Sequence, residues 1–119
     1  MSSVVSFEDC PKGIQMVYNN ILHFVSEVAP RLDVSFEYEI NKYNKDSYFI
    51  RRISKKEKEE NCEFFFPILN IKKSLSLHQL NEIFSVIGSH KTDLYRDVKV
   101  YTALLNTDGT VLYYEINES

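Results

Sequence analysis

The chain has 119 residues, of which 44% are hydrophobic and 26% are charged, the proportions of an ordinary folded domain. This length allows one hydrophobic core and excludes a second. The net charge of −3 excludes the broad basic field of a free-standing nucleic-acid binder, so an RNA contact would have to be local or shared with another subunit.

The N-terminal segment and the cysteines indicate an intracellular, soluble protein without a metal or a cofactor. The first five residues lack a basic region followed by an apolar one, and no run approaches transmembrane length, so we expect no membrane insertion. Cys10 and Cys62 lie far apart in sequence, and their spacing fits no zinc pattern. We expect two free thiols in a reducing compartment, and a single disulfide is the alternative.

Residues 1–12 are predicted to be an N-terminal extension, after which the domain begins with an amphipathic helix. Pro11 suits the first helical position, with Asp9 or Cys10 as the cap, and Pro30 ends the pattern. Between the two prolines the apolar residues recur at helical spacing: Ile14, Val17, Tyr18, Ile21, Leu22, Val25 and Val28.

Two strands follow and most simply form an antiparallel hairpin. Residues 34–40 alternate strictly between apolar and polar side chains, which is typical of a half-buried strand. Residues 41–46 are rich in turn formers, and residues 47–53 return as the second strand.

Residues 54–61 mix positive and negative charges with no apolar anchor, and this composition predicts a charged, solvated loop. The next run, residues 62–69, is almost continuously apolar and contains three consecutive phenylalanines, which indicates a strand covered on both faces. Pro67 must then occupy a position where its missing N–H is harmless.

A second helix and a closing hairpin complete the predicted order. Ser76 and Gln79 resemble a capping box, and Gly88 ends the helix. Residues 98–105 and 110–116 then form a hairpin around an Asp-Gly turn. The prediction is a single α/β domain with a mixed sheet of about five strands and the order α-β-β-β-α-β-β.

The last strand is the strongest candidate site. A terminal strand this apolar leaves an unpaired edge to be hidden, and a partner chain is the expected cover. Aromatic rings near the centre of a small interface are common energetic anchors. The predicted interface residues are Val111, Leu112, Tyr113, Tyr114 and Ile116. The alternative is that both tyrosines merely complete the core of the monomer.

A basic segment at residues 51–58 is a second candidate site, because it would suit the phosphates of RNA. The residues predicted to contact RNA are Arg51, Arg52, Lys55 and Lys56. Three glutamates at positions 57, 59 and 60 almost neutralise this segment, which favours an ordinary solvated surface instead.

Three ordered segments carry a resemblance to a known family: residues 63–68 (Glu-Phe-Phe-Phe-Pro-Ile), residues 76–84 (Ser-Leu-His-Gln-Leu-Asn-Glu-Ile-Phe), and residues 103–114 with the Asp-Gly turn and the Tyr-Tyr pair. Together with the predicted order of elements, they resemble the smallest, fifteen-kilodalton structural subunit of the eukaryotic tRNA-splicing endonuclease, the Sen15 family. The resemblance covers nearly the whole chain. An Asp-Gly turn occurs in any hairpin, whereas the ordered set is much more specific.

The resemblance implies a fold and a place in a larger enzyme. Two of the four endonuclease subunits cut precursor tRNA and two are structural, and the smallest subunit belongs to the structural pair. Residues 13–119 are then expected to be similar to the nuclease-like C-terminal domain of archaeal splicing endonucleases, with a charged loop at residues 54–61. In that family two such domains join through their C-terminal strands into one continuous sheet, and Tyr113 and Tyr114 match the joining strand.

The resemblance also implies partners and a location. The expected direct partner is the catalytic thirty-four-kilodalton subunit, while the other subunits and precursor tRNA are met through the complex. Isolated chains are expected to pair with themselves as a homodimer. Family relatives are nuclear in animals and lie on the outer mitochondrial surface in yeasts.

Catalytic residues of the family do not have clear counterparts in this sequence. Relatives that cut RNA use a tyrosine base, a histidine acid and a lysine that stabilises the charged transition state. The region of the histidine reads Glu-Asn-Cys-Glu at residues 60–63, and the glycine pattern before the tyrosine is replaced by Ile-Arg-Arg at residues 50–52. Lys99 lies close to the position of the lysine. We therefore expect no independent active site.

The leading functional hypothesis is a non-catalytic structural subunit of the tRNA-splicing endonuclease. One alternative is a stand-alone RNA-binding module that uses the basic segment. Another is a cryptic ribonuclease that combines Lys99 with His78 or His90.

Overall fold

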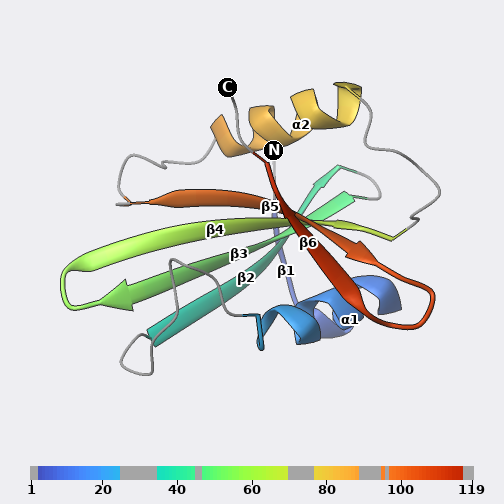
Figure 1. Ribbon diagram of the computed structural model, residues 1–119, viewed down its shortest axis with the longest axis horizontal. Coiled ribbons are helices and arrows are strands. Elements are labelled where there is room, and N and C mark those ends of the chain that lie inside the picture. The colour runs from blue at the N-terminus through green and yellow to red at the C-terminus, as the bar shows by residue number, and fades with distance from the viewer. Residues whose placement is uncertain are drawn as a thin grey trace.

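A six-stranded sheet is the frame of the molecule, and its strands lie side by side in chain order, β1-β2-β3-β4-β5-β6 (Figure 1). The computed structural model describes residues 3–24, 35–44, 47–69, 77–88, 95 and 97–116. The strands are β1 (Ser3–Val5), β2 (Ser35–Asn44), β3 (Ser47–Lys56), β4 (Glu59–Ile68), β5 (Val98–Leu105) and β6 (Val111–Glu115). The helices are α1 (Lys12–Ile21) and α2 (Leu77–Gly88), with a short 3₁₀ turn η1 (Phe7–Asp9) before α1.

Neighbouring strands are antiparallel except β4 and β5, which are parallel. A parallel pair needs a crossover connection, and α2 lies in that connection. The predicted α/β class, the mixed sheet and the element order from α1 onward are confirmed. The sheet has one strand more than expected, because β1 also joins it.

The two helices cover opposite faces of the sheet: Figure 1 shows α2 above it and α1 below it. One buried cluster lies on the α1 face and comprises Cys10, Ile14, Val17, Ile21, Ile40, Ile50, Phe65, Tyr101 and Ala103. The other lies on the α2 face and comprises Phe49, Cys62, Phe64, Phe66, Ile83 and Val100. Alternate phenylalanines of β4 therefore serve different clusters, which explains why this central strand is apolar without alternation.

Pro67 lies where its missing N–H does no harm, as the sequence requires. The N–H of Cys62 donates to Asp97 O, on the β5 side, so every second N–H of β4 points toward β5 and Pro67 points toward β3. Pairing between β3 and β4 ends at Ile50 and Phe65, before Pro67 is reached. Its position therefore breaks no bond of the ladder.

The first helix is shorter than the apolar pattern predicted. Pro11 is its N-cap residue and the helix ends at Ile21, while residues 25–30 lie outside the described residues. Ile14, Val17 and Ile21 are buried, as helical spacing required.

Two expectations about the ends of elements were wrong. Residues 1–12 are not a separate extension, because β1 pairs with β2 and Cys10 enters the core. Residues 54–61 are not a loop: β3 runs to Lys56, β4 begins at Glu59, and only two residues turn between them. Cross-strand partners such as Lys55 and Glu60 let these charged residues form a ladder, which composition alone does not reveal.

A buried ion pair joins the middle of the sheet to the end of α1. The Arg52 side chain on β3 is 1% exposed and that of Glu63 on β4 is 0% exposed. Nε and Nη2 of Arg52 each lie 2.7 Å from Oε1 of Glu63, and Nη1 donates to Ile21 O at 3.2 Å and to Phe24 O at 2.8 Å. Ile21 is the last residue of α1 and Phe24 lies three residues beyond it, where the chain leaves the helix and its carbonyls need hydrogen-bond donors from elsewhere. Arg52 therefore caps α1 from the sheet.

We predict that Glu63→Ala lowers the free energy of unfolding by about 3–5 kcal/mol, because it removes the buried carboxylate that lies against the guanidinium of Arg52. Urea unfolding followed by circular dichroism measures this change. Glu37→Ala is the control, since Glu37 pairs with Lys55 at the surface, and it should cost less than about 1 kcal/mol. Equal losses in the two variants would contradict the role given to the buried pair.

Candidate partner-binding edge

The last strand, β6, is an edge of the sheet, as the sequence predicted. Among the described strands its neighbour is β5, and β1 forms the opposite edge. Its register with β5 runs from Tyr101 opposite Glu115 to Leu105 opposite Val111. The side of β6 that points away from β5 is therefore available to another strand.

The main-chain groups that face this open side belong to alternate residues. The N–H of Ile116 donates to Val100 O at 2.7 Å, and the N–H of Asn106 donates to Thr110 O at 2.8 Å. In an antiparallel ladder bonded pairs alternate with unbonded ones, so Leu112 and Tyr114 bond to β5. The N–H and C=O groups of Val111, Tyr113 and Glu115 point outward.

Tyr113 is anchored inside its own monomer. Its ring stacks on Phe24 with centroids 4.0 Å apart, meets Phe65 edge-on at 5.9 Å, and its hydroxyl donates to Oδ1 of Asn20. Burial raises the pKa of Tyr113 to about 12, although the nearby charge of Arg52 acts in the opposite direction. The reading of the tyrosines as part of the monomer core is thus correct for Tyr113. Asn20 and Phe24 carried no signal in the sequence that linked them to β6.

The opposite face of β6 is apolar and open to solvent. Leu112 is 47% exposed and Tyr114 is 56% exposed. Ile116, which directly follows the strand, packs against the cluster on the α2 face, and Val111 packs with Tyr113 on the α1 side. The five predicted interface residues therefore divide between the core and an exposed apolar surface, on which Leu112 and Tyr114 are the accessible side chains.

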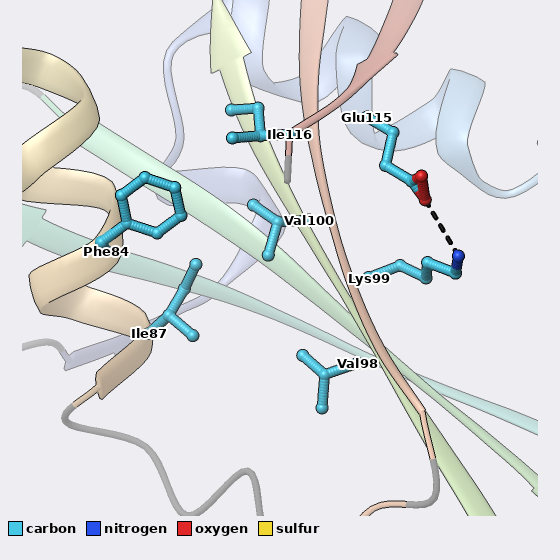
Figure 2. Close-up of a pocket in the computed structure, with 7 residues that line it drawn as sticks. All are labelled: Phe84, Ile87, Val98, Lys99, Val100, Glu115 and Ile116. Carbon is cyan, nitrogen blue, oxygen red and sulfur yellow. Dashed lines mark ion pairs between the residues drawn. The ribbon is translucent and has the colours of Figure 1, made fainter. Parts of the chain in front are cut away.

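A cavity of about 250 Å³ lies at the end of β6, between α2 and the first half of β5. Figure 2 shows its apolar side chains on the α2 side of β5, and the ion pair of Lys99 and Glu115 on the other side of that strand. The Lys99 Nζ lies 3.1 Å from Oε1 of Glu115. None of the seven lining residues is a histidine or a tyrosine, and the side chains of His78 and His90 lie outside the described part of the chain.

The basic segment does not form a common surface. Arg52 is buried against Glu63, so it is excluded from an RNA contact, and that prediction was wrong for this residue. Arg51, one residue earlier, points to the other face of the sheet and lies 3.1 Å from Glu39. Lys55 pairs with two glutamates, 37 and 60, at 3.2 and 3.5 Å. The side chain of Lys56 lies outside the described residues.

The two thiols are free and lie on opposite faces of the sheet. Burial raises the pKa of Cys10, and it raises that of Cys62 to about 12. Within the described ranges, no three His, Cys, Asp or Glu residues gather as metal ligands would. No helix there has the length and apolar character needed to cross a bilayer.

We predict that ionisation of Tyr113 destabilises the fold between about pH 10 and pH 12. Its pKa is raised from an ordinary 10.0 in the unfolded chain to about 12 in the folded one, so its contribution is complete below pH 10 and disappears as the pH approaches 12. The stability difference between wild type and Tyr113→Phe should shrink over this range in urea titrations. Asn20→Ala removes the same hydrogen bond but keeps the phenol, so its difference from wild type should change less. If the stability difference between wild type and Tyr113→Phe stays constant over this pH range, the raised pKa of Tyr113 in the folded chain is contradicted.

Comparison with known proteins identifies the family. Residues 17–119 match the model of the Sen15 protein family, a span that begins within α1 and takes in every later element through β6. Neither the comparison with curated proteins nor the comparison with solved structures finds a match. The resemblance seen in the sequence is confirmed, because the matched span is most of the chain. The chain therefore belongs to the Sen15 family, whose members are subunits of the tRNA-splicing endonuclease.

Proposed function

We propose that this chain is a non-catalytic structural subunit that binds a catalytic subunit of the tRNA-splicing endonuclease through β6. The observation that carries the proposal is the open edge: a terminal strand whose outward main chain is unclaimed by the described strands and whose neighbouring surface is apolar. A strand added to such an edge gains main-chain hydrogen bonds, and its affinity and specificity then depend on the side chains on the two faces.

The partner strand would bond to the outward N–H and C=O groups of Val111, Tyr113 and Glu115. The side chains of Leu112 and Tyr114 would then pack against the partner on the α2 face, where they are about half exposed. Tyr113 contributes through its main chain, because its ring already packs under α1. Strand addition typically combines a short ladder of main-chain hydrogen bonds with burial of alternate side chains, and both are proposed here.

The partner that we propose is the catalytic thirty-four-kilodalton subunit, with which this chain would form one continuous sheet. That arrangement assumes that the domain is similar to the nuclease-like domain of splicing endonucleases, which is part of the proposal. The other subunits and precursor tRNA would be met through the assembled complex. A nuclear location, or the mitochondrial surface in a yeast, belongs to the same proposal.

A non-catalytic role is supported by what occupies the positions of the family's catalytic groups. In the region of the family histidine, Cys62 and Glu63 are buried, and Glu63 is committed to Arg52. Lys99, near the position of the catalytic lysine, is paired with Glu115. The hypothesis of an RNA-binding module has less support, because Arg51, Arg52 and Lys55 of its segment each lie against a carboxylate.

The same edge would let isolated chains form a homodimer with two-fold symmetry. The register that uses all three outward residues places Tyr113 opposite Tyr113 of the second copy, and Val111 opposite its Glu115. In this register the three pairs exchange six main-chain hydrogen bonds, which is more than any shifted register allows. Leu112 then lies directly opposite Tyr114 of the second copy.

We predict that Leu112→Lys combined with Tyr114→Lys abolishes co-purification with the catalytic subunit and leaves the monomer folded. Both side chains are exposed in the monomer, whereas a partner strand would bury the new charges. Val4→Lys with Leu69→Lys is the matched control, because it changes two exposed apolar residues outside β6 and away from the end of α1. A one-to-one complex retained by the β6 variant would refute the proposed function.

We predict a specific cross-link in the homodimer. When chains carrying Leu112→Cys are mixed with chains carrying Tyr114→Cys, oxidation should join the two kinds of chain, because directly opposed unbonded pairs have Cα atoms about 4.5 Å apart, within reach of a disulfide. Chains that carry only Leu112→Cys should not cross-link to each other, since diagonal neighbours are about 7–8 Å apart. Mass spectrometry of the oxidised mixture identifies which chains are joined. Cross-links between two Leu112→Cys chains, without cross-links between the two kinds of chain, would exclude the proposed register.

A further inference from the structure

We propose that the Arg52–Glu63 pair positions the partner-binding edge, acting through the C-terminal end of α1 on Tyr113 of β6. This inference rests on the proposed function, because it concerns the same edge. It assigns to a buried charge pair on β3 and β4 a role in positioning the strand that the partner would bind. Two consecutive contacts, together with the position of Tyr113 in β6, support this inference.

The first contact joins the sheet to the helix. Glu63 holds the guanidinium of Arg52 at 2.7 Å through two nitrogens, and the third nitrogen donates to Ile21 O and Phe24 O. A cation beside the last carbonyls of a helix is favourable for the helix dipole. The guanidinium carbon also lies 5.7 Å from the centre of the Phe24 ring. Both the backbone and the ring of Phe24 are therefore placed by Arg52.

The second contact joins the end of the helix to β6. Phe24 stacks on Tyr113 with an interplanar angle of 26°, and its ring meets Phe65 and Tyr101 edge-on at 5.8 and 5.5 Å. Asn20, one turn earlier in α1, accepts the hydrogen bond of the Tyr113 hydroxyl. Two residues near the end of α1 thus hold one residue of the edge strand.

The last step concerns the place of Tyr113 in the edge strand. Tyr113 is the middle one of the three residues whose main-chain groups point outward, so its position sets the height and twist of the ladder offered to a partner. The strand has five residues, bonds to β5 along one side, and rests on its α1 face through the packing of Val111 and Tyr113. A shift of Phe24 would therefore be passed directly to the binding edge.

A variant can separate this positioning role from a simple contribution to stability. Replacing a buried ion pair by apolar residues of similar volume is often neutral or stabilising. Arg52→Met with Glu63→Leu keeps the space filled, but it removes the donors to Ile21 O and Phe24 O. The matched control is Arg51→Met with Glu39→Leu, which removes the neighbouring ion pair on the opposite face of the sheet.

The experiment measures two quantities on the full chain: the affinity for the purified catalytic subunit, and amide hydrogen exchange in the free protein. For Arg52→Met with Glu63→Leu we expect binding weakened on the order of tenfold. Amides of Leu112 and Tyr114, which bond to β5, should lose protection while those in the β3–β4 ladder keep theirs. A purely structural role would lower protection throughout the sheet. The control variant should match wild type in both measurements.

Phe24→Leu provides an independent variant, because it keeps the ion pair and removes the ring between Arg52 and Tyr113. It should reproduce the loss of affinity and the local loss of protection in β6, even if the double variant fails to fold. Wild-type affinity and protection in Phe24→Leu would overturn this inference and leave the proposed function intact. Failure of the wild-type chain to bind the catalytic subunit would instead refute the proposed function.

Discussion

The pairing of Arg52 with Glu63 inside the sheet is the constraint on which the α1 face of the molecule depends. Removing a charge from water costs roughly several kcal/mol per ion. The attraction to the partner charge and further hydrogen bonds must offset this cost. Here the offset comes from adjacent strands and from the carbonyls of Ile21 and Phe24. The register of the β3–β4 hairpin and the position of α1 are therefore coupled, since a shift of either one breaks a buried charge-assisted contact.

The two faces of β6 differ, because one face packs against residues at the end of α1 and the other face is exposed. Tyr113 is held by its ring under α1 and offers only its main chain outward, whereas Leu112 and Tyr114 offer apolar side chains on the other face. A strand that is fixed by one face and open at its edge loses little conformational freedom when a partner binds, which favours affinity. The architecture of the edge thus agrees with the place of the Sen15 family in a multisubunit endonuclease.

Surface charges in the β2–β3–β4 region pair across strands and do not form one basic field. Arg51 faces Glu39, and Lys55 lies between Glu37 and Glu60. Partly exposed pairs of this kind add little stability, and they make Arg51 and Lys55 less available to phosphate.

The sequence by itself determined the class and order of the elements, because helical spacing, strict alternation and the apolar run before Pro67 are local patterns that require only neighbouring residues. It also placed an apolar strand last in the chain and identified the family. Only the tertiary structure decided that Arg52 is fully buried while Arg51 is partly exposed on the other face, that residues 54–61 form strand ends, and that Tyr113 and Tyr114 have different roles. These features depend on register across strands and on the contact between α1 and the sheet, and residues that are distant in sequence leave no local pattern from which such contacts can be read.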